Sequence, residues 1–230
     1  MKSGAMRSIL MAMTLAVGLG SQAQAANIVI NPAFSLGDSG FTSGYSAASG
    51  GPGSCWPEGV YAVVTSPNAC HPSWAAFGDH TTGSTQMMVV NGAGTPGVIA
   101  WSEVLGVLPN TQYYFSAWVA SVYPVSPAQL QFSINGTTLG SIFAASPTPG
   151  SWQQFFAPWN SGSNTTATIA LVNQNTIADG NDFALDDIML DTERPNDGID
   201  TTPVPEPASL ALLGFGLSVV AARRRRAAKR

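Results

Sequence analysis

The sequence predicts an all-β fold for the central region of the chain, from about residue 26 to residue 190. Short runs of β-branched and aromatic residues alternate there with turns rich in Gly, Pro, Asn and Ser. No helical periodicity persists for three turns outside the two chain ends. Many short strands at regular spacing, joined by polar turns, are typical of a β-sandwich or a β-barrel.

Roughly ten strands are expected, each bounded by turn-forming residues. The region is long enough for one domain with a normal hydrophobic core. The expected strands are Asn27–Asn31, Val60–Thr65, Gln86–Val90, Val98–Leu105, Gln112–Ser121, Ala128–Ile134, Thr137–Phe143, Ser151–Ala157, Thr165–Asn173 and Asp182–Leu190.

The clearest local signal is a β-hairpin. Leu130, Phe132 and Ile134 alternate with polar residues, and Asn135-Gly136 follows at once. Asn-Gly is the preferred pair for a type I′ turn because both positions need a positive φ. The strands on either side of this pair are therefore expected to be antiparallel neighbours.

The amino terminus, residues 1–25, has the parts of a secretory signal peptide. A basic start and an apolar stretch at residues 9–19 are followed by Ala23-Gln24-Ala25, the small-x-small pattern that signal peptidase recognises. The apolar stretch is too short for a membrane span. We expect cleavage after Ala25, with Ala26 as the alternative.

The carboxyl terminus has an apolar stretch, Ala208–Ala222, followed at once by Arg223, Arg224, Arg225 and Arg226. Basic residues stay on the cytoplasmic side, so an inserted C-terminal helix would leave the main domain outside the inner membrane. A permanent tail anchor and a nucleic-acid-binding tail are the alternatives. Residues 191–203 are polar and contain Pro, which predicts a linker.

Charge divides the chain into basic ends and an acidic middle. The net charge of the whole chain is -4, yet no Lys or Arg occurs from Asn27 to Leu190, where eight acidic residues lie. Such a domain repels phosphate backbones, which excludes nucleic acid as a partner. A buried acid in it must rely on backbone donors, on protonation or on a metal ion.

The two cysteines, Cys55 and Cys70, predict a disulfide. An even pair in an exported domain favours this bond, which would stabilise the fold by about 3 kcal/mol. The alternative is a zinc site that also uses His71 and His80. Adjacent Cys70 and His71 are awkward co-ligands, and the spacing matches no common zinc module.

The tail combines Pro205-Glu206-Pro207, the apolar stretch and the arginines of 223–226, in this order. Over residues 204–230 it resembles a PEP-CTERM sorting signal. The resemblance implies a Gram-negative host and recognition by an exosortase, a membrane protease-transpeptidase. The tail would span the inner membrane transiently, and its removal near the Pro-Glu-Pro motif would deliver the domain to the cell surface or the extracellular matrix.

Four short segments of the central region share a pattern with one group of known domains. They are Asn31–Phe34, Leu108–Val119, Gly150–Trp152 and Asp182–Leu190. Together they resemble the galactose-binding-like domains that include many carbohydrate-binding modules. The resemblance implies a jelly-roll β-sandwich and association with exopolysaccharide.

Asp186 and Asp187 stand in an otherwise apolar predicted strand. In the jelly-roll relatives an aspartate at this place helps to hold a structural calcium ion. The resemblance implies that Asn31 and Ser35 would help to complete its oxygen shell. Alternatively, one aspartate caps backbone amides and the other is solvated.

Five aromatic residues in predicted loops or strand ends are candidates for sugar binding: Trp56, Trp74, Tyr45, Tyr123 and Trp159. A sugar stacks its C–H face on an aromatic ring, while its hydroxyls bond to polar side chains. The expected ligand is a neutral glycan, because no cation is available to bind an acidic one. The strand residues Trp101, Trp118 and Trp152 are expected in the core.

No catalytic motif accompanies these residues. His71 and His80 lack the sequence context of a hydrolase, and nothing distinguishes Glu58 and Glu103, a conceivable glycosidase pair, from surface carboxylates. Two functions remain: a non-enzymatic protein that binds polysaccharide, or a structural surface protein without a small ligand. Exposed, coplanar Trp56 and Trp74 favour the first, and burial of both favours the second.

Overall fold

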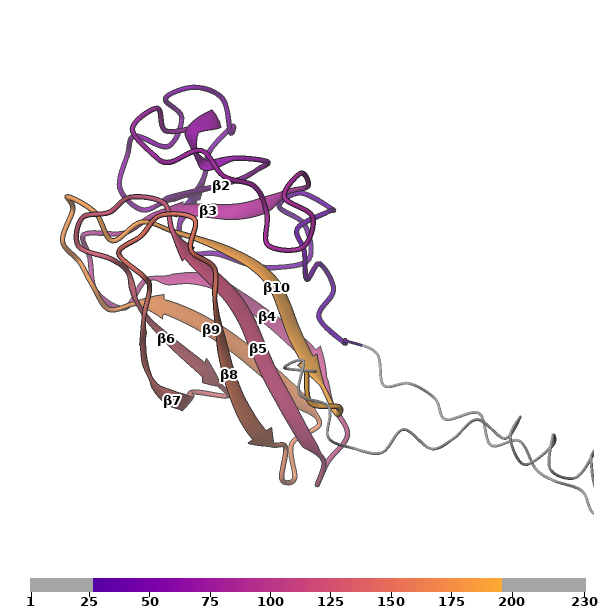
Figure 1. The fold of residues 1–230 in the computed structure, drawn as a ribbon. Coiled ribbons are helices and arrows are strands. Elements are labelled where there is room, and N and C mark those ends of the chain that lie inside the picture. Colours follow the sequence, from indigo (N-terminus) through magenta and orange to yellow (C-terminus); the bar gives the residue numbers. More distant parts are fainter. Residues whose placement is uncertain (1–26, 196–230) are drawn as a thin grey trace, which may run out of the picture. The chain divides into compact units, whose positions relative to one another are not determined.

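The computed structural model describes residues 27–195, which form two packed β-sheets (Figure 1). The larger sheet contains β1 (Ser46–Ala47), β2 (Val60–Val64), β3 (Met87–Asn91), β5 (Gln112–Ser121), β8 (Gln153–Asn160) and β10 (Phe183–Asp191). The smaller sheet contains β4 (Ile99–Gly106), β6 (Gln129–Ile134), β7 (Thr137–Ala144) and β9 (Thr166–Asn173). The predicted all-β sandwich of roughly ten strands is confirmed.

The strand order is β1-β2-β3-β10-β5-β8 in the larger sheet and β4-β9-β6-β7 in the smaller one. The short β1 pairs with β2 in parallel, and the other pairs of these sheets are antiparallel. Strands far apart in the sequence, such as β3 and β10, are therefore neighbours. This pairing brings the segment that precedes β10 beside the end of β3.

Alternation along β5 explains which side chains fill the space between the sheets. Tyr113 and Phe115 belong to the main core, whereas Tyr114 and Trp118 lie on the outer face of the larger sheet. Successive side chains of a strand point to opposite faces, so this division follows from the sequence. Trp101 of β4 is buried in the core, as predicted.

A second apolar cluster covers part of the outer face of the larger sheet. It joins Cys55, Cys70 and Trp74 to side chains of β2, β3 and β10. Figure 1 shows the loops of this part of the chain, in purple, gathered beside β2 and β3. The cluster holds the cysteine loop against the sheet.

Two local backbone features have a clear cause. Asn135 and Gly136 join β6 to β7 with φ values of 50° and 75°, which confirms the predicted hairpin. In β10, a register shift between Asp186 and Met189 marks a β-bulge, and Asp187 has a φ of 44°. The bulge re-aims the aspartate side chains relative to a regular strand.

The predicted first strand, Asn27–Asn31, is wrong. Ile28 donates one backbone hydrogen bond to Leu190, and the Asn27 side chain bonds to the β10 backbone, but no strand forms. The Pro32 carbonyl accepts a further backbone hydrogen bond from Ile188 at 2.9 Å, but Pro32 has no N–H to donate, and turns follow it. The prediction also missed β1, whose two small, exposed residues give no hydrophobic alternation.

Several predicted segments lie outside the described residues. These are the signal peptide, most of the linker, and the whole tail with its apolar helix. Among the residues that the structure describes, no helix is long and apolar enough to cross a membrane.

Candidate functional site

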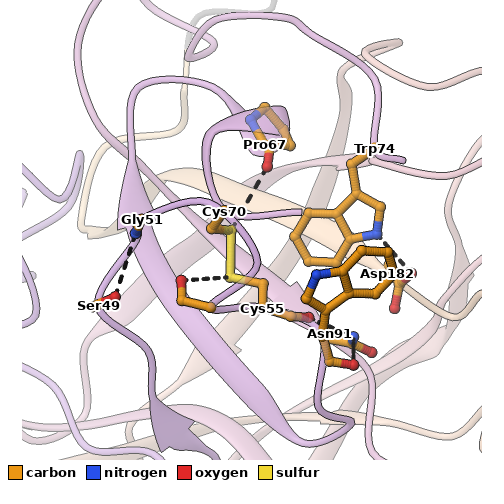
Figure 2. The surroundings of a disulfide bond; sticks show 10 residues. Ser49, Gly51, Cys55, Pro67, Cys70, Trp74, Asn91 and Asp182 are labelled. Carbon is orange, nitrogen blue, oxygen red and sulfur yellow. Dashed lines mark hydrogen bonds between the residues drawn. A yellow bond between two sulfur atoms is a disulfide. The ribbon is translucent and has the colours of Figure 1, made fainter. Parts of the chain in front are cut away.

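The disulfide between Cys55 and Cys70 fixes one end of the larger sheet (Figure 2). The two Cα atoms are 5.2 Å apart, and both cysteines are fully buried. The backbone N–H of Cys55 donates to the carbonyl of Cys70 at 3.2 Å. The disulfide prediction agrees with the structure, and the zinc alternative is wrong because both sulfurs are bonded to each other.

Three aromatic rings contact one another beside this disulfide: His71 stacks on Trp74, whereas Trp56 is tilted by 53° against His71. The ring of His71 lies between Trp56 and Trp74, with centroid distances of 4.3 Å and 4.7 Å. Trp74 is 4% exposed, and its indole N–H donates to Asp182 at 3.0 Å (Figure 2). Trp56 is 57% exposed and presents its ring to solvent.

The rings line a cleft of about 280 Å³. Trp56, Trp74 and Tyr123, three of the five predicted sugar-binding residues, meet there. The remaining lining residues are Glu58, His71, Ser73, Asn91, Ala178, Asp179, Gly180 and Asp182. The sequence left the exposure of Trp56 and Trp74 open, and the structure divides them: Trp56 is exposed, whereas Trp74 is buried.

Carboxylates give the cleft its charge. The pKa of Asp182 is raised to about 7, first by burial and then by the nearby carboxylates of Glu58 and Asp179; hydrogen bonds from Gly92 and Trp74 act in the opposite direction. Burial also raises the pKa of Glu58. Burial lowers the pKa of His71, so this imidazole is uncharged at neutral pH.

Asn91 is a buried polar side chain in the wall of the cleft. Its amide N–H₂ donates to the carbonyls of Cys55 and Trp56, at 2.8 Å and 3.3 Å. This orientation leaves Oδ1 as a buried acceptor without a hydrogen-bond partner among the described residues. The Nδ1 atom of His71 is likewise buried and has no hydrogen-bond partner among the described residues. Buried polar groups of this kind call for a partner.

Two predicted sugar-binding residues do not belong to the cleft. Tyr45 is 5% exposed, and its hydroxyl accepts a hydrogen bond from the backbone of Ala93 inside the core. Its assignment as a sugar-stacking ring is therefore wrong. Trp159 is half-buried against Tyr113 at the start of β5, whereas Tyr123 follows the end of that strand.

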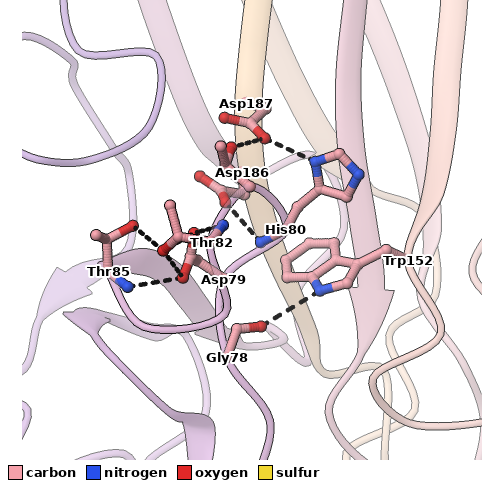
Figure 3. A network of polar contacts seen from close by, with 9 residues as sticks. Gly78, Asp79, His80, Thr82, Thr85, Trp152, Asp186 and Asp187 are labelled. Carbon is pink, nitrogen blue, oxygen red and sulfur yellow. Dashed lines mark hydrogen bonds and ion pairs between the residues drawn. The ribbon is translucent and has the colours of Figure 1, made fainter.

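Asp186 and Asp187 contact the loop that contains His80, a contact that the sequence analysis did not predict (Figure 3). Asp186 is 1% exposed and accepts a hydrogen bond from the backbone N–H of His80 at 2.9 Å. Asp187 bonds to the His80 ring at 2.7 Å and to the hydroxyl of Thr81. The His80 ring stacks on Trp118, with centroids 3.7 Å apart.

Asp79 organises the same loop (Figure 3). Its carboxylate accepts hydrogen bonds from the backbone N–H groups of Thr82 and Thr85, at 2.9 Å and 2.7 Å. Burial alone would raise the pKa of Asp79, but these bonds and those from the threonine hydroxyls lower it to about 2. The indole N–H of Trp152 donates to the carbonyl of Gly78 at 3.3 Å, which adds a further contact between this loop and the rest of the domain. Trp118 and Trp152, both predicted in the core, thus lie half-buried beneath this loop.

The proposed calcium ligands do not form a ready cation shell. The Asn31 side chain bonds to Leu36, Gly37 and Ser39 within its own loop, and Ser35 is exposed. Over residues 27–195 the structure shows no group of three His, Cys, Asp or Glu side chains suited to a metal ion. Calcium binding stays a prediction, and the arrangement gives it no support.

Glu58 and Glu103 occupy different environments. Glu58 is exposed at the cleft, whereas Glu103 is buried in β4 and accepts a hydrogen bond from the backbone of Ile30 at 2.9 Å. They lie on different structural elements and have different partners. Nothing in this arrangement assigns them the roles of a catalytic pair.

Sequence reasoning missed His71, Asn91, Asp179 and Asp182 as parts of one site. His71 follows Cys70 directly, so its place beside the disulfide had a signal in the sequence. Asn91 and Asp182 come together only because β3 pairs with β10. No local pattern could indicate that contact.

Comparison with known proteins separates the tail from the domain. The tail matches a family model described as a PEP-CTERM protein-sorting motif. Residues 203–226 are a PEP-CTERM sorting motif. A PEP-CTERM signal implies exosortase-dependent export in Gram-negative bacteria. Its recognition confirms the interpretation of Pro205, Glu206, Pro207 and the arginine cluster. No curated protein matches the chain.

Solved structures resemble the domain in fold. An arabinose-bound α-L-arabinofuranosidase, MgGH51, has a TM-score of 0.50 at 13% identity; the match covers 72% of this chain and 26% of that one. The CBM22-1–CBM22-2 tandem of Xyn10C from Paenibacillus barcinonensis has a TM-score of 0.47 at 17% identity. The match covers 74% of this chain and 47% of that one. The complex of TmCBM61 with β-1,4-galactotriose has a TM-score of 0.45 at 15% identity. The match covers 72% of this chain and 97% of that one. The predicted jelly-roll sandwich is confirmed as a fold.

Proposed function

We propose that this exported protein binds a carbohydrate at the cell surface or in the extracellular matrix, through the cleft beside the Cys55–Cys70 disulfide. The observation that favours this function is the exposed Trp56 ring next to His71, with carboxylates and an unpaired amide oxygen on the same cleft. A flat ring beside hydrogen-bonding groups is the combination that a sugar requires. Similarity at the identities found establishes only the fold.

The disulfide makes the cleft a preformed site. Trp56 and His71 are attached directly to the two bonded cysteines, and Asn91 ties the backbone of Cys55 and Trp56 to β3. Little conformational entropy is then lost when a ligand binds. A shallow cleft of this kind suits weak binding, with a Kd on the order of 10 µM to 1 mM.

Replacement of Trp56 by alanine tests this function. The full chain is to be applied to immobilised chitin, chitosan, xylan, galactan and cellulose, and the retained fraction measured. The Trp56→Ala variant is expected to lose about 1–3 kcal/mol of binding free energy, enough to abolish retention. Its melting temperature is expected to stay unchanged because the ring is mostly exposed.

Leu108→Ala is the matched control, because Leu108 is 66% exposed and lines a separate hollow of the surface. It is expected to retain full binding. The competing function is a structural surface protein without a ligand; burial of both tryptophans would favour it, and only Trp74 is buried. That function takes precedence if no polysaccharide is retained, or if the Trp56→Ala variant binds as well as the parent.

A further inference from the structure

The cleft gathers three acidic side chains, and no Lys or Arg is among the residues that line it. Glu58, Asp179 and Asp182 all line it, and no Lys or Arg occurs from residue 27 to residue 190. Burial raises the pKa of Asp182, and the carboxylates of Glu58 and Asp179 raise it further. His71 adds no compensating charge, because burial lowers its pKa.

The exposed aromatic ring beside these acids also favours a positively charged ligand. The face of Trp56, which is 57% exposed, carries the negative part of the ring quadrupole, which attracts a cation held close to it. Glu58 and Asp179 are exposed and therefore within reach of a ligand in the cleft. An acidic ligand would be repelled here, and a neutral one would leave the carboxylates uncompensated.

A second observation at the cleft is an unpaired hydrogen-bond acceptor on one of its lining residues. Asn91 is 5% exposed, and its amide is held in one orientation by two donated hydrogen bonds. Its Oδ1 atom is an acceptor with no partner among the described residues. Carboxylates, the Trp56 ring face and this oxygen all suit a ligand that is cationic and rich in donors.

We propose that the ligand is an amino sugar with a free ammonium group, as in a glucosamine polymer. This inference rests on the proposed function and specifies the charge of the sugar, in place of the neutral glycan expected from the sequence. The ring of the sugar packs on Trp56, and its ammonium group is held by the exposed carboxylates of Glu58 and Asp179. The hydroxyl groups supply donors for the remaining acceptors.

Calorimetry with two matched oligomers tests the inference on the full chain. A glucosamine tetramer, at a pH where its amines are protonated, is compared with an N-acetylglucosamine tetramer of the same ring geometry. The glucosamine tetramer is expected to bind about 10-fold more tightly. This preference is expected to shrink when NaCl is raised from about 20 mM to about 500 mM, because salt screens exposed charges.

Charge-removing variants identify the groups responsible. Glu58→Gln and Asp179→Asn are expected to lower affinity for the glucosamine tetramer several-fold each while affecting the acetylated tetramer little. Asp38→Asn, at an exposed acid outside the cleft, is the matched control and is expected to change neither. Melting curves are expected to show that all three variants fold, since the three side chains are exposed.

The outcomes separate this inference from the proposed function. Equal or tighter binding of the acetylated tetramer, with loss in Trp56→Ala, overturns the amino-sugar inference and leaves sugar binding intact. Undiminished glucosamine binding in the Glu58→Gln/Asp179→Asn double variant also overturns it. Failure of both tetramers and of every tested polysaccharide to bind overturns the proposed function itself.

Discussion

Asp186 is a buried carboxylate without a basic partner, and its titration affects the stability of the domain. Its pKa is raised to about 7, first by burial and then by the adjacent Asp187, although the backbone N–H of His80 opposes the shift. An unfolded aspartate titrates near 3.8. Between these values the folded state binds more protons than the unfolded state, so stability falls as pH rises from about 4 to about 7.

Replacement by asparagine removes this titration and keeps an acceptor for the His80 backbone. The free energy of unfolding of Asp186→Asn is expected to fall less than that of the parent between pH 5 and pH 8. At pH 8 the variant is expected to gain about 1–2 kcal/mol, a value discounted for solvent screening. Chemical denaturation at several pH values measures both effects, and parallel curves for the two proteins would contradict the prediction.

Single residues differ in how far the sequence predicts their roles. Cys55 and Cys70 were predictable because they are the only cysteines of an exported chain, and Trp56 because it adjoins one of them. Trp118 was expected in the core, because the sequence does not reveal that its side of β5 is the outer face, covered by the loop of His80. Tyr45 was assigned wrongly, because nothing local to it reveals that its hydroxyl accepts a bond from Ala93.

At the level of elements, most strands follow from local patterns. The β6–β7 hairpin has alternating side chains and an Asn-Gly turn, which together fix its register. The β1 strand lacks such a pattern and exists because it pairs with β2. The site itself depends on contacts between segments distant in the sequence, such as Trp74 with Asp182, and these were beyond local reasoning.

The disulfide loop is the element on which the cleft depends. In the Cys55→Ser/Cys70→Ser variant, the unfolded chain regains the freedom of a loop whose ends are 15 residues apart. The expected loss is about 3 kcal/mol of stability, together with weaker retention on polysaccharide. Denaturation of the parent with and without reductant measures the loss, and the variant serves as the control that reductant should not affect. An unchanged melting temperature in the reduced parent would contradict this dependence.

For the whole molecule, the sorting motif predicts two forms of the chain, one before and one after removal of the tail. The acidic domain has no Lys or Arg from 27 to 190, whereas the motif at 203–226 ends in four arginines. Processing near Pro205-Glu206-Pro207 would leave the surface form without the basic cluster. Mass spectrometry of protein taken from the cell surface is expected to find no peptide that contains Arg223–Arg226. Recovery of intact Arg230 on that form would favour a permanent anchor instead.

The buried disulfide also determines when the cleft comes into existence. In the reducing cytoplasm Cys55 and Cys70 remain thiols, so the backbone that supports Trp56 and His71 is not yet fastened there. Oxidation follows passage into the envelope, and only then are the rings and Asn91 held in place. Newly made chains are therefore expected not to bind sugars inside the cell. Under the proposed function, sugar binding therefore begins only after export.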